Sequence, residues 1–225
     1  MSPGRALEAK YRIAETAMGL FLEQGYESVT VEAVADASRV SRRTVFRYFR
    51  GKDELPFPDH SERLALVEAH LTGASDGEDP LEAVIAATEA SLRDFVARPQ
   101  LVFRRYRLTR LVPELRDREI VEHERYIALT SAYLRARLPE GTPSYQALGL
   151  ASLIDAMHRT ALGNWARSEG ATDPTTELEA GMEWVRSLTS QLGHESAPLL
   201  VAVLPDTPEA RRTLTSLRDK AAELP

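Results

Sequence analysis

The sequence predicts an all-α protein with an N-terminal three-helix domain and a longer C-terminal helical bundle. Apolar residues recur every three or four positions along almost the whole chain, as in amphipathic helices. Alternation typical of strands is confined to one short ambiguous run, LLVAVL at 199–204. Glycine and proline mark the breaks between periodic segments, which indicates a series of separate helices.

Three helices are expected within residues 1–55. The first carries its apolar residues at helical spacing and ends at Gly25, a residue type that favours helix ends. Thr30 can cap a second helix, VEAVADAS, and Ser41 a third, RRTVFRYF, because a hydroxyl can accept from a free backbone N–H. Three apolar residues are expected to anchor the third helix to the core: Val45, Phe46 and Phe49.

Six longer helices are expected after these, separated by breaks such as PEGTP and EGATDP. They cover residues 60–72, 80–97, 99–111, 114–138, 143–168 and 174–193. We place the N-terminal domain at 1–55 and the helical ligand-binding and dimerisation domain at 56–195. Residues 196–225 form a C-terminal extension that we expect to be partly helical.

Composition narrows the class of protein. The 225 residues include 34 acids and 28 bases, a net charge of −6, and about 43% are hydrophobic, which is enough for a sizeable core. The absence of cysteine excludes a disulfide scaffold and thiol chemistry. No uninterrupted apolar stretch suits a secretory signal or a membrane span, so we expect a cytoplasmic protein with no membrane partner.

Positive charge is concentrated in RVSRRTVFRYFRGK, residues 39–52, which holds six cations and no acid. A local basic patch on an acidic chain is typical of a protein that meets a polyanion at one site. A solvated helix face is the alternative explanation, although such faces usually mix charges of both signs.

The basic segment lies in the pattern of a helix-turn-helix, two short helices joined by a tight turn after a longer helix. The second helix of this motif enters the DNA major groove, where arginine is the commonest bidentate reader of guanine. We expect base contacts from Arg42, Arg43, Thr44 and Arg47. We expect phosphate contacts from Tyr48, from Lys52 and from the helix start at Thr30.

Residues 11–55 resemble the DNA-binding domain of the tetracycline-repressor (TetR) family of bacterial transcription regulators. The matching positions are Ile13, Ala17, Phe21, Gly25-Tyr26, Thr30-Val31, Val34-Ala35, Val40-Ser41, the run from Thr44 to Phe49, Lys52 and Glu54-Leu55. The resemblance implies a homodimer that binds a palindromic double-stranded DNA operator, most often as a repressor. It also implies release when a small-molecule effector binds the C-terminal domain.

Two positions depart from the family's pattern. Arg39 stands where the turn usually has glycine, so a left-handed backbone there would cost about 1 kcal/mol, which a contact from Arg39 to phosphate could offset. Arg47 stands where relatives often have histidine, so operator preference cannot be transferred from them.

The C-terminal bundle contains the candidates for effector binding. Aromatic, methionine and histidine side chains at helical spacing could line a pocket or could simply be core. Together with one arginine the candidates are Phe103, Tyr106, Arg107, Met157, His158 and Trp165. His158 has no second ligand at metal spacing, so we expect no metal site.

The segment FRRYRLTRLVPELRDRE holds six arginines. Ion pairs with acids such as Glu119, Glu122 and Glu124 would explain them, and so would an anionic ligand. The run from Arg107-Leu108 through Val112-Pro113-Glu114-Leu115-Arg116 resembles the branch of the family with acyl-CoA-type ligands. An acyl-CoA or another anionic amphiphile is therefore a candidate effector.

The last two long helices carry apolar stripes with small residues between them. The stripe residues are Leu150, Ala151, Ile154, Met157, His158, Ala161 and Trp165 on one helix, and Leu178, Gly181, Met182, Val185, Leu188 and Leu192 on the other. The resemblance assigns these helices to a symmetric dimer seam, and packing within one chain is the alternative.

Motifs of catalysis are missing from the sequence. It has no nucleophile elbow, phosphate-binding loop, HExxH motif or paired carboxylates, so we expect no catalytic residue and no cofactor. A helical-bundle enzyme, a DNA-binding regulator without an effector, and an activator instead of a repressor remain the alternatives.

Overall fold

The computed structural model describes residues 3–75 and 77–192, and within these ranges helices are the only regular secondary structure. The all-α prediction is confirmed. The ambiguous run at 199–204 and the extension from residue 196 lie outside the described residues.

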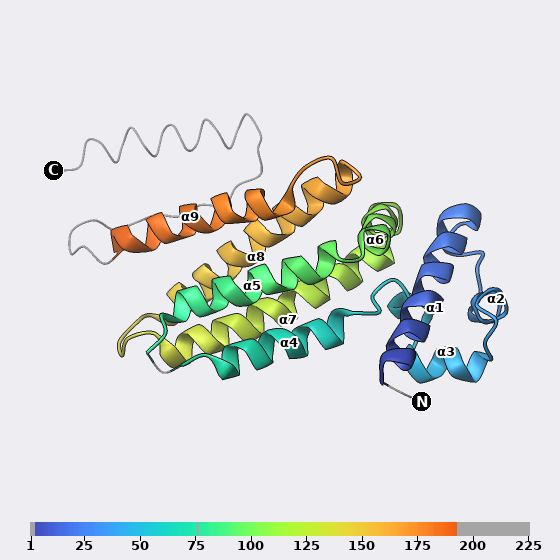
Figure 1. The fold of residues 1–225 in the computed structure, drawn as a ribbon, viewed down its shortest axis with the longest axis horizontal. Coiled ribbons are helices and arrows are strands. Elements are labelled where there is room, and N and C mark those ends of the chain that lie inside the picture. The colour runs from blue at the N-terminus through green and yellow to red at the C-terminus, as the bar shows by residue number, and fades with distance from the viewer. Residues whose placement is uncertain (1–2, 76, 193–225) are drawn as a thin grey trace. The chain divides into compact units, whose positions relative to one another are not determined.

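The N-terminal part is built from α1 (Pro3–Gln24), α2 (Val31–Ala37) and α3 (Arg42–Tyr48), followed by a 3-10 turn, η1 (Lys52–Glu54) (Figure 1). The two short helices pack on α1, and their shared core contains Ile13, Ala17, Phe21, Val34, Val45 and Phe49. This arrangement matches the helix-turn-helix expected from the sequence.

The predicted longer helices are all present in the described residues. They are α4 (His60–Gly73), α5 (Pro80–Val96), α6 (Pro99–Leu111), α7 (Pro113–Arg137), α8 (Ser144–Arg167) and α9 (Pro174–Leu192). Each end lies within one residue of the prediction. Four of these helices begin with proline, whose fixed φ suits the first helical position and whose missing N–H is not needed there.

A second core fills the bundle, in which α7 packs against α8, and α5 contacts both of them and α4. Its members include Val84, Ile85, Leu92, Leu134, Ile154 and Met182. The apolar stripes predicted on α8 and α9 are buried within the chain at Ala151, Ile154, His158, Ala161, Trp165, Leu178, Met182 and Val185. For these residues, packing within one chain is therefore the correct alternative.

The helix-turn-helix core continues into the bundle. Leu101 and Leu108 of α6 and Leu115 of α7 are buried in the same cluster as Phe21 and Val45. Residues 1–186 form one compact unit, and 187–225 form a second, of which the structure describes only the part up to Leu192. The domain boundary near residue 55 stays a prediction. None of the described helices is long and apolar enough to cross a membrane.

Candidate functional site

Two hydroxyl caps set the ends of the helix-turn-helix. Thr30 Oγ1 accepts from Ala33 N at 3.1 Å, and Ser41 Oγ accepts from Thr44 N at 3.1 Å. Each bond satisfies a backbone donor that the first turn of a helix leaves free. Both caps were predicted, and both are confirmed.

The turn between α2 and α3 passes through Arg39, whose φ of 55° is left-handed. The backbone N–H of Arg39 donates to Asp36 O, and that of Val40 donates to Ala35 O, both at 3.0 Å, so the end of α2 is closed by its own chain. The left-handed conformation confirms that this position has the backbone for which glycine is favoured.

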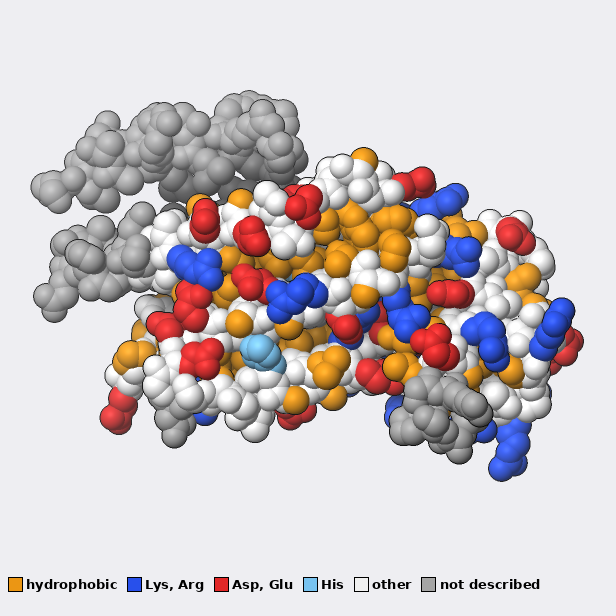
Figure 2. Space-filling view, in the orientation of Figure 1, with side chains coloured by type: hydrophobic (Ala, Val, Ile, Leu, Met, Phe, Trp, Pro, Cys, Tyr) orange, Lys and Arg blue, Asp and Glu red, His pale blue; other side chains and the backbone are white. Residues whose placement is uncertain are grey.

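The outer face of α3 is basic. Arg42, Arg43 and Arg47 are exposed, while Val45 and Phe49 are buried against α1 and α2. In Figure 2 basic side chains project from the end of the molecule where α1–α3 lie, at the right of the view. The predicted base readers therefore share one solvent-facing side of the recognition helix, with α3 held from behind by its apolar residues.

The prediction that Phe46 anchors α3 to the core is wrong. Its side chain is 43% exposed, and the guanidinium of Arg42 lies 5.2 Å from its ring centroid. Successive helix residues are turned by about 100°, so Val45 and Phe49 share a face whereas Phe46 stands beside it. The ring belongs to the basic outer face.

The exposed arginines of α3 differ in the hydrogen bonds and ion pairs that they make within the protein. Arg42 Nε lies 2.8 Å from Glu32 Oε1, and Arg47 donates to the hydroxyl of Tyr48 at 3.0 Å. Arg43 makes no hydrogen bond or ion pair with any residue in the described part of the chain. Because an exposed ion pair contributes only about 0–1 kcal/mol, Glu32 can give up Arg42 to a DNA phosphate or base at little cost.

Lys52, an expected phosphate contact, and Thr44, an expected base reader, both make contacts within the protein. Lys52 Nζ donates to Glu27 O at 3.4 Å and lies 4.2 Å from the ring centroid of Tyr26, which leaves further N–H donors for another partner. The hydroxyl of Thr44 lies 2.9 Å from Ser41 Oγ, so it is partly occupied by the cap.

Three of the six effector-site candidates, Phe103, Tyr106 and Trp165, belong to one apolar cluster around Phe95, whereas Met157 and Arg107 lie outside it. Phe103 and Trp165 pack with ring centroids 4.7 Å apart, and the hydroxyl of Tyr106 accepts from Arg167 Nε at 3.1 Å. Met157 packs against Gly181 of α9 instead. The remaining candidate on α6, Arg107, is exposed.

His158 is buried against Phe95, with ring centroids 5.6 Å apart. Burial lowers the pKa of His158 to about 4, and the nearby carboxylate of Asp155 opposes this only in part. The imidazole is therefore neutral at pH 7. Its Nε2 has no hydrogen-bond partner among the described residues, so a polar atom is left free inside the bundle.

A buried ionic cluster at the start of α4 was missed by the sequence reasoning. Asp59 is fully buried, and its two carboxylate oxygens accept from Arg63 Nε at 2.9 Å and Arg105 Nη1 at 3.0 Å. Burial alone would raise the pKa of Asp59, but the two guanidinium groups outweigh it and lower the pKa. The spacing of Asp59 and Arg63, four residues apart, was the available signal.

Partners within the protein explain most of the arginines in the arginine-rich segment. Arg105 pairs with Asp59, Arg110 lies 3.8 Å from Glu119 Oε2, and Arg118 lies 3.3 Å from Glu122 Oε1. Arg104 and Arg116 donate to backbone carbonyls. Internal pairing accounts for these arginines, and Arg107 alone in the segment has no such partner among the described residues.

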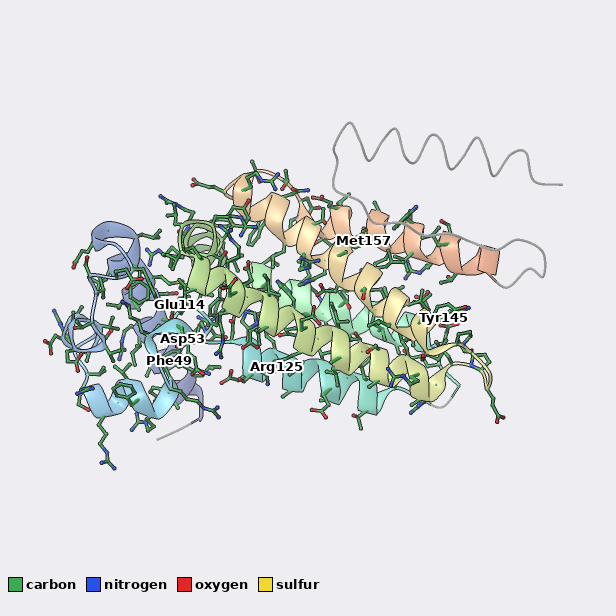
Figure 3. The ribbon with its side chains drawn as sticks, turned by 180° about the vertical axis from the view of Figure 1, so that it is seen from behind. Phe49, Asp53, Glu114, Arg125, Tyr145 and Met157 are labelled. Atoms are coloured by element: carbon green, nitrogen blue, oxygen red, sulfur yellow. The ribbon has the colours of Figure 1, made fainter. Side chains whose placement is uncertain are left out.

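Contacts between α7 and the helix-turn-helix were also missed. Tyr26 donates to Glu114 Oε1 at 3.4 Å, and Arg118 lies 3.4 Å from Asp53 Oδ2 and 3.2 Å from Glu54 Oε1. Figure 3 labels Asp53 and Glu114, which lie at this junction. Nothing in the local sequence pattern predicts these pairs, because each joins positions more than sixty residues apart.

Comparison with known proteins connects the N-terminal part to one family. Residues 13–56 match the sequence model described as bacterial regulatory proteins, tetR family. The transcriptional regulator TcmR of Streptomyces glaucescens is 40% identical over 84 residues, 36% of each chain. A Mycobacterium tuberculosis protein, provisionally named as the mycofactocin biosynthesis transcriptional regulator MftR, is 24% identical over 163 residues, 72% of this chain and 82% of its own.

Solved structures share the whole fold at low identity. A provisionally assigned TetR-family regulator from Syntrophomonas wolfei has a TM-score of 0.62 at 17% identity, covering 87% of this chain and 98% of its own. Thermus thermophilus FadR, a repressor solved with lauroyl-CoA, has a TM-score of 0.52 at 21% identity, covering 86% of this chain and 100% of its own.

Proposed function

We propose that this chain is a TetR-family transcriptional regulator that represses transcription by binding a palindromic operator as a homodimer, which a small-molecule effector releases. The observation that carries the proposal is the outer face of α3, which has three exposed arginines. Ser41 caps this helix, and buried Val45 packs its other side against the core. In this proposal Arg42, Arg43, Thr44 and Arg47 contact bases, and Thr30, Arg39, Tyr48 and Lys52 contact phosphates. Phe46 joins the reading face, where its ring can contact an apolar base edge.

The proposed dimer is supported by apolar side chains exposed near the start of α8. Tyr145 is 70% exposed and Leu148 is 49% exposed. Large exposed apolar residues on long helices are typical of interfaces between copies. Because the buried stripe of α8 is used within the chain, the proposed seam uses this outer face instead.

The effector is proposed to bind in the bundle near α6 and α8. The Nε2 of His158 has no hydrogen-bond partner within the described ranges, and the exposed Arg107 lies on the helix beside the Phe103–Trp165 pair. Lauroyl-CoA in the FadR structure makes acyl-CoAs the first compounds to test here. An acyl-CoA or another anionic amphiphile would place its negative charge against an arginine and its hydrocarbon chain in the apolar interior.

A regulator without an effector is the second candidate. It is favoured by the direct packing of Phe103 on Trp165 and of Met157 on Gly181, since candidate pocket residues that fill one another's space leave less room for a ligand. In either case we propose a cytoplasmic DNA-binding protein with no catalytic activity, no cofactor and no metal.

Selection of bound duplexes from a random DNA pool tests the operator function. We expect enrichment of a palindromic sequence with two equal half-sites. Release of the protein from that duplex by an acyl-CoA series, compared with coenzyme A alone, then tests the effector. Absence of any enriched sequence would remove the operator function, whereas enrichment without release by any ligand would favour the second candidate.

A further inference from the structure

A single side chain, Arg118 on α7, contacts three carboxylates on two elements. Its Nη1 lies 3.4 Å from Asp53 Oδ2 and its Nη2 lies 3.2 Å from Glu54 Oε1, both on η1. Its Nε lies 3.3 Å from Glu122 Oε1 on α7 itself, a contact that is an ion pair but is not aligned as a hydrogen bond. The planar guanidinium presents five N–H donors in a fixed fork, which spans more widely separated carboxylates than the compact ammonium of a lysine.

The contact to Glu54 leads directly to the recognition helix. Glu54 Oε2 accepts from the backbone N–H of Arg50 at 2.8 Å, and Arg50 follows Phe49, the residue that closes α3. One carboxylate therefore joins the end of α3 to α7 through Arg118. The only other polar contact of α7 with the helix-turn-helix in the described residues is the Tyr26–Glu114 bond at 3.4 Å.

The other end of this connection is fixed inside the protein. Glu122 is only 3% exposed, and its second oxygen accepts from Arg125 Nη1 at 3.0 Å. A buried carboxylate must keep its cationic partners, because losing one leaves charge without solvent or compensation. The ion pair with Glu122 therefore restrains Arg118, which has less freedom to leave η1 than an ordinary surface arginine.

The same turn of α7 touches the helix that carries the effector-site candidates. His123 Nδ1 lies 3.6 Å from Asp155 Oδ1 on α8, three residues before His158. A shift of α8 relative to α7 would therefore reach residues 122 and 123, which adjoin the Arg118 contact. Through these contacts α7 is joined both to α8 and to η1, the turn that follows α3.

We propose that Arg118 is a positioning residue that fixes the recognition helix relative to α7 and thereby sets the half-site spacing that the dimer accepts. The inference rests on the proposed operator function. In a dimer that reads two half-sites, the distance between recognition helices must match the DNA repeat. Arg118 makes no base contact in this account and acts only through Asp53 and Glu54.

The experiment compares Arg118→Gln with Arg125→Gln in the full chain. Arg125 contacts the same buried Glu122 but reaches neither Asp53 nor Glu54, so it controls for the loss of a partner of Glu122. Affinity is measured for the selected palindrome, for versions with the spacer changed by one or two base pairs, and for a single half-site. Thermal unfolding of each variant establishes that it is folded.

Wild type and Arg125→Gln are expected to bind the native spacing about tenfold or more tightly than the altered spacings. Arg118→Gln is expected to reduce this preference to within about threefold, with half-site affinity unchanged; tenfold corresponds to about 1.4 kcal/mol and threefold to about 0.7 kcal/mol. Arg118→Lys keeps the charge but replaces the planar fork with one compact ammonium, so it should lose most of the preference as well. Should Arg118→Gln fail to fold, the lysine variant decides.

Two results overturn the inference while leaving the operator function intact. Either Arg118→Gln and Arg118→Lys keep the wild-type preference for spacing, or Arg125→Gln loses the preference equally. A wild type that binds no palindrome in preference to unrelated DNA is a different outcome, because it removes the operator function and the inference together.

Discussion

Arg39 combines a structural cost with a position beside the recognition helix. Its φ of 55° is unfavourable for a residue with a Cβ, and it lies two residues before the cap of α3. The sequence predicted this conflict because arginine replaces the glycine typical of such turns. Backbone strain is typical of functional sites, and a contact from Arg39 to DNA phosphate would explain the strain at this position.

Arg39→Gly should raise the free energy of unfolding by up to about 1 kcal/mol, because glycine tolerates the left-handed backbone. Arg39→Ala removes the same side chain but keeps the strain, so it is the matched control. Urea unfolding of the two variants isolates the backbone contribution. Equal stability of the glycine and alanine variants would contradict the strain argument.

Arg43 and Lys52 differ in the kind of DNA contact expected of them. Arg43→Ala should lose about 1–3 kcal/mol of discrimination at one base pair, since this exposed arginine is free to read a base. Lys52→Ala should weaken binding to all sequences alike and reduce the salt slope by about one. Affinities for a panel of single-base operator variants measure both, and an unchanged base preference in Arg43→Ala would show that Arg43 does not read a base.

The helices themselves could be predicted closely from local chemistry. Proline at the first position fixed the starts of α5, α6, α7 and α9, and hydroxyl caps fixed α2 and α3. The buried face of a short helix was harder to predict, because only Val45 in α3 and Phe49 at its C-cap are buried, while Phe46 lies beside them. Long-range pairs such as Arg118–Glu54 were beyond prediction, since the sequence pattern contains no signal linking such distant positions.

Ser41→Ala should lower the free energy of unfolding by about 1 kcal/mol, because the side-chain cap at Thr44 N is lost at the start of α3 and only its backbone acceptor, Ser41 O, remains. It should also weaken DNA binding, since the first turn of α3 carries the proposed readers. Ser61→Ala on the exposed face of α4 is the control, and we expect it to change stability by less than about 0.5 kcal/mol. Chemical unfolding tests this, and equal effects of the two substitutions would rule out a special role for the cap.

At the scale of the whole molecule, exposed positive charge lies on α3 and two buried histidines lie in the bundle. The basic face of α3 stands on a chain whose net charge is −6, which favours approach to DNA through that face alone. The bundle holds neutral His158 and His60, whose pKa values burial lowers below that of a free histidine. The stability of the whole protein should therefore depend on pH below neutrality.

The free energy of unfolding should fall as pH drops below about 6.5. In this range the unfolded chain binds a proton at His158, whereas the native state binds it only near pH 4, the lowered pKa of the buried imidazole. By pH 5 this one group costs about 2 kcal/mol. His158→Leu removes the titration, so its loss of stability between pH 7 and pH 5 should be smaller than that of wild type, with His60 accounting for part of the remainder. Urea unfolding at the two pH values gives the comparison, and equal losses in the two proteins would contradict a buried neutral His158.

The measurement that most directly tests the central claim is the affinity of the wild-type protein for its selected palindrome, for one half-site and for an unrelated duplex, at 50 and 200 mM salt. The account predicts far tighter binding to the palindrome than to either other duplex. With about 6–10 phosphate contacts, affinity should fall by about 10³–10⁵ between the two salt concentrations. Equal affinity for all three duplexes, or binding that salt leaves unchanged, would contradict a dimeric operator-binding regulator.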